Sequence, residues 1–177
     1  MLSRFMTTLF PPDLYDAAHV LLADLQRHAL LITTAESCTG GLLVGLLTEV
    51  PGSSGMVERG YVTYSNAAKT ELLGVPADMI SRHGAVSEEV ARAMAQGALK
   101  RTPAHIAISV TGIAGPDGGS PGKPVGLVYL AVAVHGEEPR VRECRFGNIG
   151  RCEIRLSSVR AAIELLRTAV KPGLPHA

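Results

Sequence analysis

The segment Val125–Val134, VGLVYLAVAV, constrains the fold of this chain more than any other. It carries no charged residue, so it has no face suited to water. We therefore predict a strand in the middle of a sheet that is covered on both faces. The chain has 177 residues, which fits one domain, and 46% of them are apolar but only 4% aromatic. An aliphatic interior combined with many Gly and Pro turns favours α/β layering.

Charge and cysteine usage exclude several classes of protein. The chain has 17 basic and 16 acidic residues, a balance that argues against binding nucleic acid through bulk positive charge. Its apolar runs are shorter than the roughly 18 residues needed to cross a bilayer. Three cysteines without C-x-x-C spacing, and a start without a secretory signal, favour a reducing compartment. We expect a cytoplasmic protein with no membrane or nucleic-acid partner.

Apolar periodicity and turn residues predict the order of the elements. We expect a single domain over residues 1–177, with an N-terminal helix, a core and a C-terminal helix at 12–28, 30–146 and 151–170. Within the core, the patterns predict strands at 30–35, 57–64, 104–110, 125–134 and 140–146, and helices at 39–50, at 66–73 and after Ser87. Alternating arginines place the strand at 140–146 on a sheet edge, where charge discourages aggregation.

The string TAESCTGG at Thr34–Gly41 lies between a predicted strand and a predicted helix. Ser37 would stand at the rim of the backbone N–H groups that a helix start leaves unpaired, those of Cys38, Thr39, Gly40 and Gly41. Such amides can bind an anion or a developing oxyanion. Two alternatives remain open: Ser37 or Thr39 caps the helix, or the Cys38 thiol is a rival nucleophile.

The string YVTYSNAAK at Tyr61–Lys69 offers a base. If Ser65 caps the next helix, Lys69 lies about one turn inside it, and Tyr64 and Lys69 can project toward the same end of the sheet. A lysine acts as a base only when neutral, so burial must lower its pKa by about three units from roughly 10.4. The alternative is an ordinary solvated surface lysine.

The loop Thr111–Pro124 contains five glycines and three prolines. Glycines let backbone amides approach a ligand closely, and Lys123 offers a point charge for a phosphate. The loop matches no nucleotide-binding motif, and a surface loop stiffened by proline is the alternative. The six histidines show no zinc-ligand spacing, so we predict no metal.

Five strings in order over about Leu30–Val134 resemble the CinA C-terminal domain family, which includes stand-alone nicotinamide-nucleotide amidohydrolases. They are TAESCTGG, PGSSG, ERGYVTYSNxxK, HGAVSEEV and SVTGIAGPDGGSxxKPVG. The resemblance implies a three-layer α/β/α domain with a mixed β-sheet, and a homo-oligomer. It also implies hydrolysis of nicotinamide mononucleotide to nicotinic acid mononucleotide and ammonia.

By the same resemblance Ser37, Tyr64 and Lys69 are the catalytic residues. Ser37 would attack the carboxamide carbon, and Lys69 would accept the proton directly or through Tyr64. The substrate would be bound by oxyanion-binding amides and by the Gly-rich loop, through Thr39, Gly40, Gly41, Thr111, Gly112, Gly115, Gly118, Gly119 and Lys123. No metal or organic cofactor is required.

The sequence departs from the family pattern in three places. Ala67 stands where the family often has Glu, and GNIGR replaces the usual GDR string, which leaves the role of Arg151 open. The N-terminal nucleotide-binding domain of full-length members is missing, so we expect no activity that belongs to it. The alternative function is a catalytically silent domain that binds a nucleotide or a protein partner.

Overall fold

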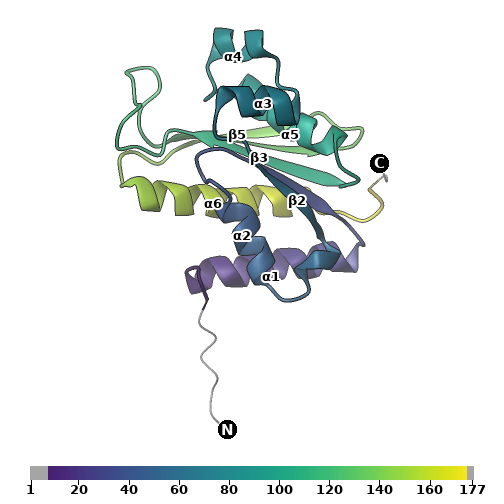
Figure 1. Cartoon of the computed structure of the whole chain (residues 1–177). Coiled ribbons are helices and arrows are strands. Elements are labelled where there is room, and N and C mark those ends of the chain that lie inside the picture. The colour runs from purple at the N-terminus through teal and green to yellow at the C-terminus, as the bar shows by residue number, and fades with distance from the viewer. Residues whose placement is uncertain (1–7, 175–177) are drawn as a thin grey trace.

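A five-stranded mixed sheet runs through the middle of the molecule (Figure 1). The computed structural model describes residues 8–174, so most of the segment examined for a secretory signal lies outside the described residues. The strands are β1 (Ile32–Glu36), β2 (Val57–Val62), β3 (Ile106–Gly112), β4 (Leu127–Val134) and β5 (Arg140–Arg145), in the order β2-β1-β3-β4-β5. β1 is parallel to β2 and β3, whereas the β3–β4 and β4–β5 pairs are antiparallel.

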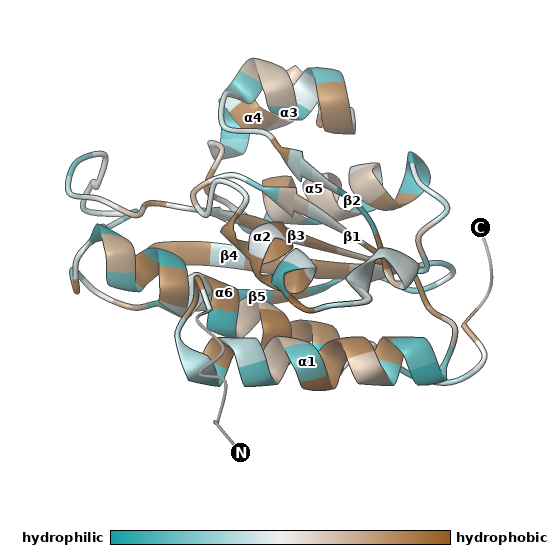
Figure 2. Cartoon of the chain, turned by 60° about the horizontal axis from the view of Figure 1, so that its bottom comes forward, coloured by the Kyte–Doolittle hydropathy of each residue, from teal (hydrophilic) through white to brown (hydrophobic). Residues whose placement is uncertain are grey.

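Helices cover both faces of the sheet (Figure 1). One layer consists of α1 (Pro12–Arg27), α2 (Leu42–Glu49) and α6 (Arg151–Arg167), and the other of α3 (Asn66–Leu73), α4 (Ala77–His83) and α5 (Glu88–Lys100). Figure 2 shows apolar residues along the inner strands and an alternation of polar and apolar residues along α1. The predicted three-layer α/β architecture with a mixed sheet is confirmed.

The two faces of the sheet carry side chains of different size because successive strand residues point to opposite sides. On β3, Ile106 and Ile108 belong to the core beneath α1, α2 and α6, whereas Ala107 belongs to the core beneath α5. Ala131 and Ala133 on β4 join Ala107. Small side chains on this face let α5 pack close to the sheet.

β4 is hydrogen-bonded on both sides and almost entirely buried, as its apolar sequence predicted. β5 lies at the sheet edge with exposed arginines, which is also as predicted. No helix within residues 8–174 has the length and apolarity to cross a membrane.

Several boundaries differ from the prediction. α2 begins at Leu42 instead of residue 39, because Gly40 and Gly41 have φ angles of +59° and +92°, which a right-handed helix does not contain. The seven-residue helix α4 and the short 3₁₀ helix at Ser53–Gly55 were not predicted, since each is too short to show apolar periodicity.

The topology gathers three connections at one end of the sheet. β1 lies between β2 and β3 in the sheet. The connection from β1 to β2 passes over one face of the sheet through α2, and the connection from β2 to β3 passes over the other face through α3, α4 and α5. In open α/β sheets, ligands bind at the carboxyl ends of the strands where such a reversal occurs. The segments that follow β1, β2 and β3 therefore meet there.

Candidate active site

Ser37 and Lys69 form a buried pair at the carboxyl end of β1. Lys69 is 1% exposed, and its Nζ lies 3.0 Å from Ser37 Oγ. The Nζ also donates a hydrogen bond to the carbonyl oxygen of Thr63 at 2.8 Å. Within residues 8–174, Lys69 forms no ion pair with a carboxylate.

This environment favours a neutral amine. Burial lowers the pKa of Lys69, because removing water disfavours the ammonium form more than the amine. Because Lys69 is 1% exposed, the alternative of a solvated surface lysine is wrong. A neutral Nζ next to a serine hydroxyl can accept the hydroxyl proton.

Local signals in the sequence bring Lys69 to this position. The Ser65 side chain caps α3, as predicted, by accepting a hydrogen bond from the Ala68 amide at 3.0 Å. Lys69 follows one turn later. The Thr63 amide donates to the carbonyl of Glu36 at 2.8 Å, which holds the end of β2 beside the residue that precedes Ser37.

Glu36, a residue that the sequence analysis did not single out, caps α2. Its carboxylate is fully buried and accepts hydrogen bonds from the amides of Gly41, Leu43 and Val44 at 3.1, 3.0 and 2.9 Å. Negative charge at the positive end of a helix is favourable, and an acidic residue just before a predicted helix was the available signal. Within the described residues, neither the Ser37 nor the Thr39 side chain accepts a hydrogen bond from the first amides of α2. The alternative that one of them caps this helix is therefore wrong.

The amides predicted to bind an oxyanion differ in what they contact. The Gly40 amide donates to the Ser37 carbonyl at 3.0 Å, and the Gly41 amide is held by Glu36. Thr39 is fully buried. Cys38, which directly follows the serine, lines the cavity. Of the four residues whose amides were predicted to bind an oxyanion, Cys38 is the one that lines this cavity, so we infer that its amide is the oxyanion donor. The residue after the nucleophile supplies such a donor in a nucleophile elbow.

Cys38 is a poor nucleophile in this environment. The residue is 5% exposed, and burial raises the pKa of its thiol to about 12. At neutral pH the thiol stays protonated, and the protonated form is unreactive. The geometry therefore favours the hydroxyl of Ser37 over the neighbouring thiol.

A cavity of about 190 Å³ opens onto the pair. Its lining includes five of the predicted site residues, namely Ser37, Tyr64, Lys69, Thr111 and Gly112. The remaining predicted loop residues lie outside this lining. Gly115 reaches the site only through its carbonyl, which accepts a hydrogen bond from Arg151 at 2.8 Å, and the Lys123 Nζ donates to the carbonyl of His83.

Arg151, whose role the sequence analysis left open, also lines the cavity. It lies in the first turn of α6, and its Nη2 donates a hydrogen bond to the Tyr64 hydroxyl at 3.1 Å. Tyr64 is 62% exposed. Among the described residues, Lys69 hydrogen-bonds to Ser37 and Thr63 and makes no hydrogen bond to Tyr64.

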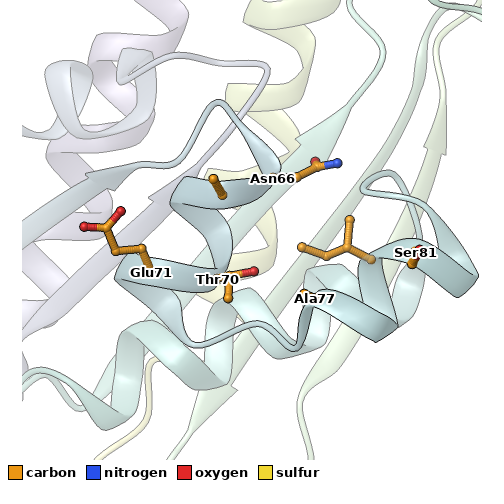
Figure 3. A pocket seen from close by; sticks show the side chains of 7 residues that line it. Asn66, Thr70, Glu71, Ala77 and Ser81 are labelled. Carbon is orange, nitrogen blue, oxygen red and sulfur yellow. The ribbon is translucent and has the colours of Figure 1, made fainter.

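A larger groove of about 530 Å³ lies next to the site, between α3 and α4 (Figure 3). Asn66 lines both the groove and the cavity, so the two are neighbours. In Figure 3, Asn66 and Glu71 extend in opposite directions from α3. The residues that line the groove contain no nucleophile beside a base comparable to Ser37 and Lys69. We therefore place the chemistry in the smaller cavity.

Fold and site together define a three-layer α/β protein with a buried Ser–Lys pair at the carboxyl end of its sheet. The chain belongs to the CinA family: the family described as the CinA C-terminal domain matches residues 15–170. A curated CinA-like protein of Gemmatimonas aurantiaca is 51% identical over 154 residues, which are 87% of this chain and 36% of that protein. The chain thus spans about a third of the length of the curated relatives it matches.

Solved structures agree with this assignment. The crystal structure of the competence/damage inducible protein CihA from Agrobacterium tumefaciens has a TM-score of 0.91 and 49% identity, over 93% of this chain and all of the other. A CinA superfamily protein from Escherichia coli has a TM-score of 0.84 and 33% identity, over 92% of this chain and 94% of the other.

Proposed function

We propose that this protein hydrolyses the carboxamide of nicotinamide mononucleotide to nicotinic acid mononucleotide and ammonia. The observation that carries the proposal is the 3.0 Å approach of a buried, desolvated lysine amine to the hydroxyl of Ser37. Amide hydrolysis needs a nucleophile and a base. The pair offers the Ser37 hydroxyl and an amine whose pKa is lowered by burial. The choice of substrate rests on the resemblance of the five motifs to the amidohydrolases of the family.

The first step forms an acyl-enzyme. Ser37 Oγ attacks the carboxamide carbon while its proton passes to the neutral Nζ of Lys69. The transfer is direct, because Lys69 contacts the serine and its other hydrogen-bond partner is the Thr63 carbonyl. We assign stabilisation of the negative oxygen of the tetrahedral intermediate to the amide of Cys38, a residue that lines the cavity.

The second half of the reaction returns the proton. The Lys69 ammonium protonates the departing nitrogen, the C–N bond breaks, and ammonia leaves a Ser37 ester. Water then attacks the ester carbon and gives a proton to Lys69. The bond to Ser37 Oγ breaks as that oxygen takes the proton back, and the carboxylic acid is released.

The phosphate of the substrate needs a cation at the cavity. Lys123, predicted for this role, is bonded to the carbonyl of His83 instead. Arg151 lines the cavity, and a guanidinium recognises phosphate oxygens well. We therefore assign the phosphate contact to Arg151.

Ammonia release from nicotinamide mononucleotide tests this function. We expect wild-type turnover, a loss of at least about 10³-fold in Ser37→Ala and Lys69→Met, and retention of most activity in Cys38→Ala, the neighbouring control. Near wild-type rates in Ser37→Ala would remove the serine as nucleophile. Binding of the nucleotide by wild type without ammonia release would instead support a silent binding domain.

A further inference from the structure

The turn that follows Ser37 is held by an arginine from the opposite end of the chain. Arg155, on α6, donates hydrogen bonds from Nε to the carbonyl of Cys38 at 3.1 Å and from Nη2 to the carbonyl of Thr39 at 2.9 Å. These contacts join residues 117 and 116 positions apart in the sequence. The guanidinium uses two donors of its rigid fork for two successive carbonyls.

Arg155 contacts the turn and is not among the residues that line the cavity. Arg151 lines the cavity, whereas Arg155 lies one helical turn further along α6 and contacts the back of the turn. A Cβ added at Gly40 would lie 3.2 Å from the Arg155 Nη2, so the guanidinium packs directly against the turn backbone.

Holding two carbonyls orients the peptide groups that contain them. In a planar trans peptide the C=O and N–H groups point in opposite directions. The Thr39 carbonyl shares its peptide with the Gly40 N–H, so drawing this carbonyl toward Arg155 turns the Gly40 N–H the other way, where it donates to the Ser37 carbonyl at 3.0 Å. The Ser37 carbonyl in turn shares its peptide with the Cys38 N–H, which therefore points away from the Gly40 amide. Arg155 thus sets the direction of the Cys38 amide through the Gly40–Ser37 hydrogen bond. The positive charge behind the turn also acts at Cys38, where it opposes the rise in the pKa of the thiol that burial causes.

We propose that Arg155 is a positioning residue for the oxyanion: it fixes the turn after Ser37 so that the Cys38 amide faces the reacting carbonyl oxygen. The inference rests on the proposed acyl-transfer chemistry at Ser37. It assigns Arg155 a share of transition-state stabilisation without contact with the substrate. Oxyanion donors act in the transition state, so their misplacement lowers kcat more than it raises KM.

The test compares Arg155→Lys and Arg155→Gln with Arg160→Gln. Arg160 is the matched control because it lies on the same helix and pairs with Asp13. We expect the Arg155 variants to lower kcat about 10- to 100-fold with KM within about twofold, and the control to behave as wild type. The pH at which activity rises should stay unchanged, because Lys69 keeps its surroundings. Thermal unfolding of each variant identifies any that fails to fold, and Arg155→Lys then carries the test.

A second readout is independent of the substrate. The rate at which a small phosphonofluoridate labels Ser37, followed by intact mass, should fall in the Arg155 variants by a factor similar to that in kcat. If wild type is labelled but releases no ammonia, the proposed function fails while the labelling rates still judge Arg155. The inference is overturned if the Arg155 variants have the same labelling rate and kcat as Arg160→Gln. It is also overturned if only KM becomes worse, or if the loss of kcat disappears at higher pH. A wild-type protein that neither reacts with the probe nor turns over would overturn it as well.

Discussion

The hydroxyl of Tyr64 accepts a hydrogen bond from Nη2 of Arg151 at 3.1 Å. This contact joins the β2–α3 connection to the first turn of α6, and both residues line the cavity. Because its hydroxyl bonds to Arg151 and the residue is 62% exposed, we expect Tyr64 to orient Arg151 and not to relay the serine proton.

Tyr64→Phe should therefore have a modest effect. We expect kcat to fall less than about tenfold and KM to rise, since loss of general acid–base catalysis would cost about 10²- to 10⁴-fold. Steady-state kinetics of Tyr64→Phe, Arg151→Met and the double variant check this. The two substitutions should be non-additive because they break one contact. A loss in kcat as large as that of Lys69→Met would restore Tyr64 to the proton path.

We expect substitutions of Arg151 and Lys123 to differ in their effect on the KM for the nucleotide. Arg151→Ala should raise KM for nicotinamide mononucleotide at least about tenfold, because it removes a charge-assisted phosphate contact. Lys123→Ala should change KM less than about twofold, since its Nζ is bonded to the His83 carbonyl. The reverse ranking in initial-rate measurements would return the phosphate to the Gly-rich loop.

The pH dependence follows from the lowered pKa of Lys69. Activity requires the neutral amine, so kcat/KM should rise with pH and level off below the ordinary lysine pKa of about 10.4. The folded pKa lies below the unfolded one, so the unfolded chain binds more protons between the two values and stability rises with pH across that window. Lys69→Met should lose this rise, which urea denaturation at a series of pH values measures. Parallel stability curves for the two proteins would show that Lys69 titrates normally.

Glu36→Gln should destabilise the protein. Its carboxylate accepts three backbone hydrogen bonds at the start of α2, and an amide side chain has one acceptor oxygen and a donor group that repels N–H. We expect a loss of about 2 kcal/mol in the free energy of unfolding, as for hydrogen bonds to a charged group. Glu71→Gln, at an exposed position of α3, is the control and should be neutral. Equal stability of both variants would contradict the capping role.

Gly97→Ala should lower the free energy of unfolding, whereas replacing a glycine by alanine within a helix usually raises it. In an unobstructed helix this change stabilises by about 1 kcal/mol. In α5 the added Cβ would lie 1.9 Å from the carbonyl oxygen of Leu73, so α3 must move. We expect a loss of about 3 kcal/mol, measured by urea denaturation. Gly55→Ala, where nothing among the described residues lies within 4 Å, should leave stability nearly unchanged.

Features that depend only on residues close together in the sequence could be predicted. The central position of β4 follows from its own apolar sequence, and the Ser65 and Ser87 caps each bond to an amide three residues on. The start of α2 was misplaced because two glycines with positive φ look, in sequence, like the first turn of a helix. α4 was missed because seven residues give too little periodicity.

The sequence alone determined the layered α/β fold, its central and edge strands, and, through the family resemblance, which serine and lysine to examine. Tertiary structure decided the surroundings of these two side chains. The strand order brings together Ser37 and Lys69, 32 positions apart, and removes water from the amine. The packing of the elements also places Arg155 against the turn after Ser37, and it brings the Lys123 amine into a hydrogen bond with the His83 carbonyl. Hydrophobic periodicity reports which face of an element is buried, but a pKa depends on which distant groups share that burial, and only the packed sheet fixes those groups.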